Sequence, residues 1–202
     1  MIYHANYLSK NQCAILLKGC GTTVRNNNIS KCPFQAIRFY GNDHTIEYNE
    51  IYNVDQESDD CGAIYCGRNS LQRGTDISYN YIHDLFTTEE LPYGFQSAIY
   101  WDDRQQGMNA NHNIIKNVRM DLASNKGTDF NYSENTTVNA VYIAQNFING
   151  GFCVNHNGGE TATDFKFGSN IKYPEIYYAA YPNLKEVISS ERSDDPKLAR
   201  FN

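Results

Sequence analysis

Two short phrases recur along the chain in a constant order, and this repeat is the feature that most restricts its fold. The first phrase begins with Ala-Ile, as in residues 63–68 (Ala-Ile-Tyr-Cys-Gly-Arg), and recurs at residues 14–19, 36–41 and 98–103. The second phrase centres on an asparagine, as in residues 77–82 (Ile-Ser-Tyr-Asn-Tyr-Ile). A repeat period of roughly 20 to 35 residues is typical of a solenoid. The central asparagines, spaced 22, 31, 33, 33 and 24 residues apart, are Asn27, Asn49, Asn80, Asn113, Asn146 and Asn170.

Apolar residues alternate with other residues in both phrases, which predicts short β-strands whose side chains point alternately inward and outward. Each rung, meaning one complete winding of the solenoid, is too short for helical crossovers between its strands. We therefore expect an all-β, parallel β-helix of about six rungs over residues 1–172, followed by an irregular tail over residues 173–202. The expected inward columns are Ile15, Ile37, Ile64 and Ile99; Leu17, Phe39, Cys66 and Trp101; Val24, Ile46, Ile77, Ala110 and Ile143; and Ile29, Ile51, Ile82, Ile115 and Ile148.

The repeated asparagines are expected to stack as a ladder at one bend of the solenoid. A side-chain amide both donates and accepts hydrogen bonds, so it can bond its neighbours in the stack and the unpaired backbone groups of the bend. Asp84 shares its rung position with Asn53 and Asn117, which favours a role in capping a turn. We expect His83 to face solvent, because its position is occupied on other rungs by the chemically varied residues Tyr52, Lys116 and Asn149.

The composition limits the classes of partner. The formal net charge is −6 and 20% of the residues are charged, so nucleic acid and an anionic membrane surface are poor partners. No run approaches the ~18 apolar residues of a membrane span. The first residues, Met1 to Asn6, have neither the basic nor the apolar region of a signal peptide. We expect no nucleic-acid and no membrane partner.

Three motifs carry a resemblance to a known family. They are D-x-G-A-I-Y-x-G-R at residues 60–68, G-x-x-I-x-Y-N-Y-I-H-D at residues 74–84, and A-I-Y-x-D-D at residues 98–103. The sequence resembles right-handed parallel β-helix proteins of the pectin-lyase-like superfamily, in particular large bacterial members that act on carbohydrates. The superfamily includes hydrolases, lyases, epimerases and non-catalytic adhesins, so the resemblance predicts fold more strongly than reaction.

The resemblance also implies a partner and a location. It implies a polysaccharide or oligosaccharide as the bound molecule and an extracellular or periplasmic location. In such proteins a tail like that of residues 173–202 precedes a further rung. We therefore expect a fragment or a shortened member of the family, whose open end is covered by the remaining part of the β-helix or by a partner chain.

Acidic residues are expected to meet on the outer face of the Ala-Ile strands. Aligning these strands places Arg68 beside Asp103 on the next rung, about 4.8 Å away, as an ion pair that is either structural or functional. The same alignment places Asp102 over Gly67, which leaves room for its side chain. Four converging carboxyl groups repel one another unless a cation, a base or a raised pKa relieves them. The expected acidic cluster is Asp59, Asp60, Asp102 and Asp103.

Aromatic and basic side chains complete the predicted site. Tyr65 and Tyr100 are expected to stack outward as a platform for a sugar ring, with Arg38 and Tyr40 as further substrate-binding residues. The leading hypothesis is a glycoside hydrolase that uses the carboxyl groups of Asp60, Asp102 and Asp103, with Arg68 orienting them and no cofactor. One alternative is a polysaccharide lyase with Arg68 or His83 as base, for which calcium is a possible cofactor. The other is a non-catalytic solenoid that binds glycans or serves a structural role.

Overall fold

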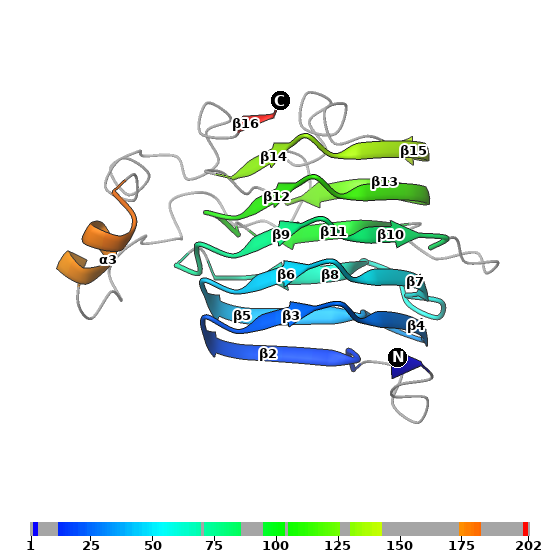
Figure 1. The fold of residues 1–202 in the computed structure, drawn as a ribbon, viewed down its shortest axis with the longest axis horizontal. Coiled ribbons are helices and arrows are strands. Elements are labelled where there is room, and N and C mark those ends of the chain that lie inside the picture. The colour runs from blue at the N-terminus through cyan, green and yellow to red at the C-terminus, as the bar shows by residue number, and fades with distance from the viewer. Residues whose placement is uncertain are drawn as a thin grey trace.

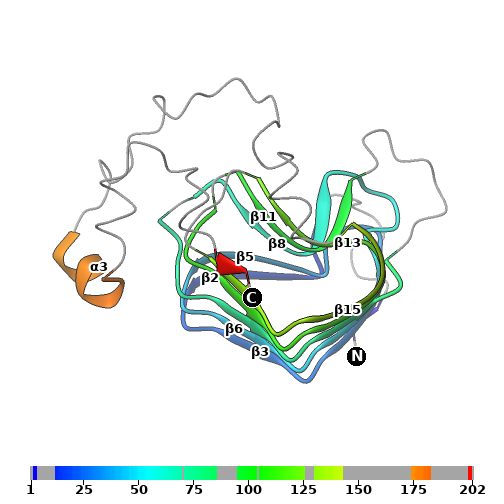
Figure 2. The ribbon, with the colours of Figure 1, turned by 90° about the horizontal axis from the view of Figure 1, so that it is seen from above.

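The chain winds into a solenoid of parallel β-strands with three sides. The computed structural model describes residues 2–3, 12–69, 71–85, 95–103, 105–125, 130–142, 174–182 and 200–201. Figure 1 shows the rungs stacked from β2 at the N-terminal end to β14 and β15 at the other end, and Figure 2 shows the three sides from above. All strand pairs in the described residues are parallel, which confirms the predicted parallel β-helix.

Each side of the solenoid, called a face below, is built from strands of successive rungs. The first face contains β2 (Ile15–Cys20), β5 (Ile37–Asn42), β8 (Cys61–Gly67), β11 (Gln96–Asp102) and the second half of β13 (Ile114–Ser124). The second face contains β3 (Thr23–Arg25), β6 (Thr45–Glu47), β9 (Asp76–Ser78), β12 (Asn109–Asn111), β14 (Asn131–Ser133) and β16 (Arg200–Phe201). The third face contains β1 (Ile2–Tyr3), β4 (Asn28–Cys32), β7 (Glu50–Val54), β10 (Tyr81–His83), the first half of β13 and β15 (Thr136–Tyr142).

An asparagine ladder forms the bend between the second and third faces, as the sequence predicts. In its centre, the backbone N–H and the side-chain amide of Asn49 both donate to Oδ1 of Asn80, at 3.0 Å each. The amide of Asn49 also donates to the carbonyl of Val24 on the preceding rung, at 3.0 Å. Each amide therefore joins three rungs. The same pattern links Asn80 to Asn113 and Asn113 to Asn135.

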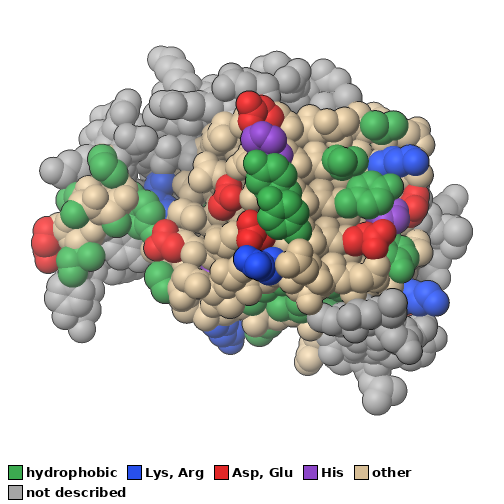
Figure 3. Space-filling model, viewed as in Figure 1, with side chains coloured by type: hydrophobic (Ala, Val, Ile, Leu, Met, Phe, Trp, Pro, Cys, Tyr) green, Lys and Arg blue, Asp and Glu red, His purple; other side chains and the backbone are tan. Residues whose placement is uncertain are grey.

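The residue before each ladder asparagine has a left-handed backbone conformation, which turns the chain at this bend. Tyr48, Tyr79 and His112 occupy this position with φ of 53°, 55° and 54°. Their rings stack on one another at 5.1 and 4.9 Å between centroids and remain exposed. Figure 3 shows this column of apolar and histidine side chains over the ends of β6, β9 and β12. The stacking offsets part of the strain that bulky residues bear in this conformation.

A second corner, at the end of the third face, uses the same conformation. Asn53, Asp84 and Asn117 have φ of 49°, 53° and 52°, and the amide of Asn117 donates to Oδ1 of Asp84 at 2.6 Å. This hydrogen bond and the bond with His83 hold the pKa of Asp84 below its usual value. The predicted role of Asp84 at a turn is confirmed by this geometry.

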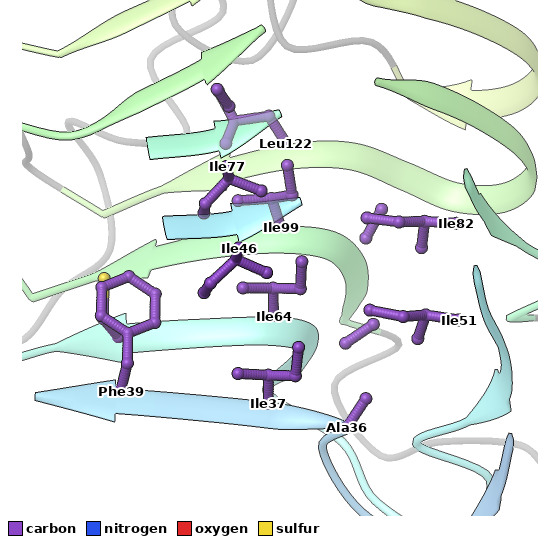
Figure 4. Packing of buried hydrophobic residues seen from close by; sticks show 14 of the residues in the cluster. Ala36, Ile37, Phe39, Ile46, Ile51, Ile64, Ile77, Ile82, Ile99 and Leu122 are labelled. Atoms are coloured by element: carbon purple, nitrogen blue, oxygen red, sulfur yellow. The ribbon is translucent and has the colours of Figure 1, made fainter. Parts of the chain in front are cut away.

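Columns of buried side chains fill the lumen. Ile37, Ile64, Ile99 and Leu122 lie at one register position on successive rungs and are almost completely buried. Figure 4 shows these side chains pointing toward those of the other faces. Each such side chain contributes about 1.5–3 kcal/mol by leaving water. The predicted register of the inward columns is confirmed from the first rung to the fourth.

The fifth rung differs from the prediction. Asn135, not Asn146, follows Asn113 in the ladder, and Tyr132 and Thr137 take the inward positions predicted for Ile143 and Ile148. The prediction failed because these inward residues are polar and so hide the apolar pattern. Their hydroxyl groups both donate to Oδ2 of Asp121, at 3.1 and 2.9 Å. Outside the described residues lie Asn146, Asn170, Ile143, Ile148 and Asn149.

The described part of the tail, which was expected to be irregular, includes a short helix, α3 (Pro174–Ala180). Proline at its first position and Glu175 in its first turn suit a helix N-terminus. Beyond it, the hydroxyl of Tyr181 donates to Oδ1 of Asp43 at 2.8 Å and fixes the tail to the loop after β5. Burial and this carboxylate raise the pKa of Tyr181. Across the described ranges, the structure contains no helix with the length and apolar character needed to span a membrane.

Replacing Asn80 by alanine is expected to lower the free energy of unfolding by about 3 kcal/mol. The reason is that several buried donors and acceptors lose their hydrogen-bond partner, and each group left unbonded costs roughly 1–3 kcal/mol. Asn27→Ala is the matched control. It lies at the end of the ladder and is half-buried, so its loss should be about half as large or less. Denaturant unfolding measures both values, and equal losses would contradict the assigned importance of the ladder centre.

Candidate active site on the first face

The outer side of the first face carries a set of hydrogen-bonded acidic and aromatic side chains. Every residue of β8 and β11 is buried, whether its side chain points into the lumen or outward. Residues Tyr65 and Gly67 of β8 pair in register with Tyr100 and Asp102 of β11. Strand periodicity therefore points these four positions away from the lumen, on two neighbouring rungs. The term acidic site is used below for Asp59, Asp60, Tyr65, Arg68, Tyr100, Asp102, Asp103 and Asn125.

Asp102 is the centre of the acidic site. Its Oδ2 accepts a hydrogen bond from the hydroxyl of Tyr65 at 2.8 Å, and its Oδ1 accepts from the backbone N–H of Asp103 at 2.7 Å and from the amide of Asn125 at 3.2 Å. Only 5% of the residue is exposed. Three donors therefore hold this buried carboxyl group in one orientation.

Gly67 makes the position of Asp102 possible, as the sequence predicts. A Cβ atom at Gly67 would lie 2.8 Å from Cβ of Asp102 and 3.1 Å from the hydroxyl oxygen of Tyr65. The first contact is shorter than two carbon atoms allow, and the second is tighter than usual, so a side chain at Gly67 would displace a neighbour. The absent side chain thus provides the space in which Asp102 and Tyr65 meet.

Arg68 and Asp103 form the predicted ion pair between rungs. Nε of Arg68 donates to Oδ2 of Asp103 at 2.8 Å, and both residues have left-handed backbone conformations at the ends of their strands. The arginine side chain is 76% exposed, so the pair adds little to stability. Hydrogen bonding and charge from Asp103 raise the pKa of Arg68 further. The amide of Asn125 bonds Oδ1 of Asp103 at 3.1 Å and so links this pair to Asp102.

Asp59 and Asp60 enter the same site from the loop between β7 and β8. Oδ1 of Asp59 accepts from the backbone N–H of Phe95 at 2.7 Å and from that of Asp60 at 2.9 Å. Oδ1 of Asp60, which is exposed, accepts from the hydroxyl of Tyr100 at 3.3 Å. The repulsion expected between the four aspartates is therefore relieved, because every carboxyl group accepts hydrogen bonds from nearby donors.

Tyr65 and Tyr100 are neighbours, as predicted, but they do not form an exposed platform. Their rings meet edge to face at 5.4 Å, and only 5% and 2% of the residues are exposed. They belong to a second apolar cluster with Phe95, Met120 and Ala123. The expectation of exposed rings is wrong because residues of neighbouring rungs cover the sheet on its outer side.

The two hydroxyl groups instead serve the carboxyl groups. Burial raises the pKa of Tyr65, and the charge of Asp102 raises it further. Burial also raises the pKa of Tyr100, with further contributions from the charges of Asp102 and Asp60 and from hydrogen bonding to Asp102. Both phenols therefore stay protonated at neutral pH and act as donors. The Tyr100 hydroxyl faces Asp60 and Asp102 together.

Arg38 and Tyr40 lie beside the acidic site on the preceding rung. The guanidinium carbon of Arg38 lies 4.8 Å from the ring centre of Tyr65 and 5.4 Å from that of Tyr40. Arg38 pairs in register with Tyr65, so the three side chains share one surface. The Nε atom of Arg38 is buried and has no hydrogen-bond partner among the described residues.

His83 is not part of the acidic site. It lies on the third face, where its neighbours in register are Tyr52 and Lys116. Its side chain is 12% exposed, not solvent-facing as predicted, and its ring stacks on those of Tyr52 and Tyr81 at 5.0 and 4.1 Å. Its nitrogen atoms contact Asp84 at 2.7 Å and Glu50 at 3.4 Å. Figure 3, which views the second and third faces, shows acidic, histidine and apolar side chains gathered there.

Asn125 is the member of the site that the sequence did not reveal. Ser124 pairs with Trp101, so Asn125 occupies on the next rung the position that corresponds to Asp102. The available signal was this register, but residues 121–125 (Asp-Leu-Ala-Ser-Asn) lack the Ala-Ile phrase that marks the other strands of the face.

Within the described ranges, no group of three or more His, Cys, Asp and Glu side chains is arranged to hold a metal ion.

The fold defines a parallel β-helix protein with an acidic site on one outer face. The family described as right handed beta helix region matches residues 5–177. The chain belongs to this right-handed β-helix family, and its fold is consistent with the pectin-lyase-like superfamily. Such a domain fits carbohydrate-active proteins broadly. Comparisons with curated proteins and with solved structures gave no match.

Replacing Tyr65 by phenylalanine is expected to lower the free energy of unfolding by about 1–3 kcal/mol, because the buried carboxyl group of Asp102 loses a donor while the ring remains. Tyr79→Phe is the control, since Tyr79 is 46% exposed; its effect should be below about 0.5 kcal/mol. Urea unfolding at neutral pH compares the two. Equal effects would show that the Tyr65 hydroxyl does not support Asp102.

Proposed function

We propose that this protein is a glycoside hydrolase that cleaves a polysaccharide at the acidic site. The observation that carries the proposal is the meeting of Asp60 and Asp102 at the hydroxyl of Tyr100, on two neighbouring rungs. Glycosidases use a pair of carboxyl groups about 5–9.5 Å apart. The hydroxyl of Tyr100 donates to Asp60 and lies close to Asp102, so the two carboxyl groups are separated by at most about two hydrogen-bond lengths, roughly 6 Å, which fits this range.

The surroundings of the two carboxyl groups suit different roles. Asp102 is buried and held by three donors, so we assign to it the attack on the sugar or the activation of water. Asp60 is exposed and accepts a hydrogen bond from the phenol of Tyr100, so we assign to it the protonation of the leaving oxygen. Asp103 and Arg68 hold the end of the strand on which Asp102 lies.

The neighbouring rung suggests the kind of sugar. The guanidinium of Arg38 lies over two tyrosine rings, and its buried Nε has no hydrogen-bond partner among the described residues. The residue as a whole is half-buried, so a carboxylate or sulfate on the substrate would pair with the charge of its guanidinium group. A polysaccharide with acidic groups is therefore the substrate class that these residues support best, with Tyr40 beside the bound sugar.

The lyase alternative has less support from the described residues. A lyase needs a base near the group that neutralises the substrate carboxylate. His83 lies on another face, the pKa values of Tyr65 and Tyr100 are raised, and Arg68 is engaged by Asp103. A non-catalytic glycan-binding solenoid is the remaining alternative, and the variants below separate it from an enzyme.

Asp102→Asn is expected to reduce hydrolysis by at least about 100-fold while glycan binding persists, because the amide keeps the shape of the group but cannot act as nucleophile or base. The assay incubates the chain with neutral and acidic polysaccharides and records new reducing ends and the ultraviolet absorbance of unsaturated uronate. Glu47→Gln, on the second face, is the control. Ultraviolet absorbance from unsaturated uronate would show that the protein is a lyase and not a hydrolase. Glycan binding without either product would favour the non-catalytic solenoid.

Arg38→Met is expected to weaken binding of acidic glycans about 10-fold, equivalent to about 1.4 kcal/mol, and to leave neutral glycans unaffected. The lost interaction is the charge-assisted bond to the acidic group. Lys116→Met, which removes an exposed positive charge on the third face, is the control. Isothermal titration measures both variants, and equal weakening by both would assign the effect to net charge.

A further inference from the structure

The segment of residues 55–60 between β7 and β8 rests on a buried carboxyl group. Asp55 begins the segment with φ of 55°, and none of its surface is exposed. Among the described residues, neither of its buried carboxyl oxygen atoms has a hydrogen-bond partner of good geometry, and the weak donor that acts on them is the thiol of Cys61. This arrangement is unusual, because buried polar atoms in folded proteins are nearly always bonded.

The other end of the segment is the acidic site. Backbone bonds hold the segment in place: the N–H of Glu57 donates to the carbonyl of Pro33 at 3.1 Å, and that of Asp60 donates to the carbonyl of Phe95 at 2.9 Å. Asp59 and Asp60 then reach Phe95 and Tyr100. Any movement of the segment therefore moves two of the four aspartates.

The surroundings of Asp55 offer little to balance a negative charge. The backbone groups of Asp55 bond the carbonyl of Phe34 and the amide of Gln96. Burial raises the pKa of Asp55, and hydrogen bonding from the buried thiol of Cys61, at the start of β8, lowers it by less. Burial raises the pKa of that thiol most, and the charge of Asp55, hydrogen bonding to Asp55 and the charge of Asp59 raise it further. In the described part of the chain, no Lys, Arg or His contributes to the pKa of Asp55.

We propose that Asp55 is a proton-dependent latch: its protonated carboxyl group keeps the segment of residues 55–60 packed, and its ionisation loosens that segment and displaces Asp59 and Asp60. An uncharged carboxyl group is tolerated in a dry corner, whereas a charged one draws in water or moves toward it. The latch concerns the geometry of the segment and does not depend on the reaction that the acidic site performs.

The direction of the pH effect follows from the burial of Asp55. Burial raises its pKa from 3.8 to about 7. The folded chain therefore holds this proton more tightly than the unfolded chain, and the stability contributed by the protonated group is lost as pH rises from about 4 to about 7. A shift of about three pKa units corresponds to as much as about a 1000-fold change in the unfolding equilibrium constant, or about 4 kcal/mol.

Hydrogen exchange of the Glu57 and Asp60 amides in the whole chain tests the latch directly. Between pH 5 and pH 8 their protection factors, which are corrected for the intrinsic rate, should fall by at least about 10-fold, while the amide of Ile82 in β10 keeps its protection. In the Asp55→Asn variant, the protection factors of the Glu57 and Asp60 amides should stay constant over the same range. The asparagine side chain carries no charge, and asparagine tolerates this backbone conformation. Asp43→Asn, at an exposed carboxyl group with φ of 58°, should behave like the unmodified chain.

Two results would overturn the proposal: protection in the unmodified chain that does not change with pH, or an equal fall in Asp55→Asn. The first is measured on the natural sequence, so it remains decisive if the variant fails to fold. Because the readout is protection of backbone amides, an absence of glycan cleavage would count against the proposed function and leave the latch standing.

Discussion

The structure depends on parallel strands held in one register from rung to rung, and the asparagine ladder is the interaction that secures this register. Each buried amide bonds a neighbouring asparagine and a backbone carbonyl of another rung. A slip of one residue would turn every inward side chain outward and would break these bonds as well. The apolar columns and the ladder therefore stabilise the same arrangement, which leaves the outer positions of the strands free for other roles.

The acidic site follows from that arrangement. Neighbouring rungs lie about 4.8 Å apart, so aspartates that are more than thirty residues apart in sequence share one small surface. Their repulsion is relieved by the hydroxyl groups of Tyr65 and Tyr100, by Arg68 and by backbone N–H groups. Asp55 is the exception, since its carboxyl group has no such partner among the described residues. Acidic groups are thus buried in this solenoid in two ways: those of the acidic site are bonded by donors, whereas Asp55 of the proposed latch depends on its proton.

Much of the fold was predictable from the sequence because its strongest signals are local. Alternation within a strand and the recurrence of Ala-Ile and Asn phrases predicted the inward columns, the ladder, the Arg68–Asp103 pair and the space above Gly67. The fifth rung escaped because Tyr132 and Thr137 are polar residues at inward positions. Their hydroxyl groups are satisfied by Asp121, a contact that no pattern of apolar residues reveals.

The sequence by itself determined the parallel β-helix, its register over four rungs and the identity of the aspartates on the first face. These follow from periodicity, which a strand expresses whatever surrounds it. Only the tertiary structure decided that Tyr65 and Tyr100 are buried donors, that Asn125 joins Asp102 to Asp103, and that His83 lies on another face. The physical reason is that the covering of an outer face depends on side chains of other rungs and on the angles at the corners, neither of which is written in the pattern of a single strand.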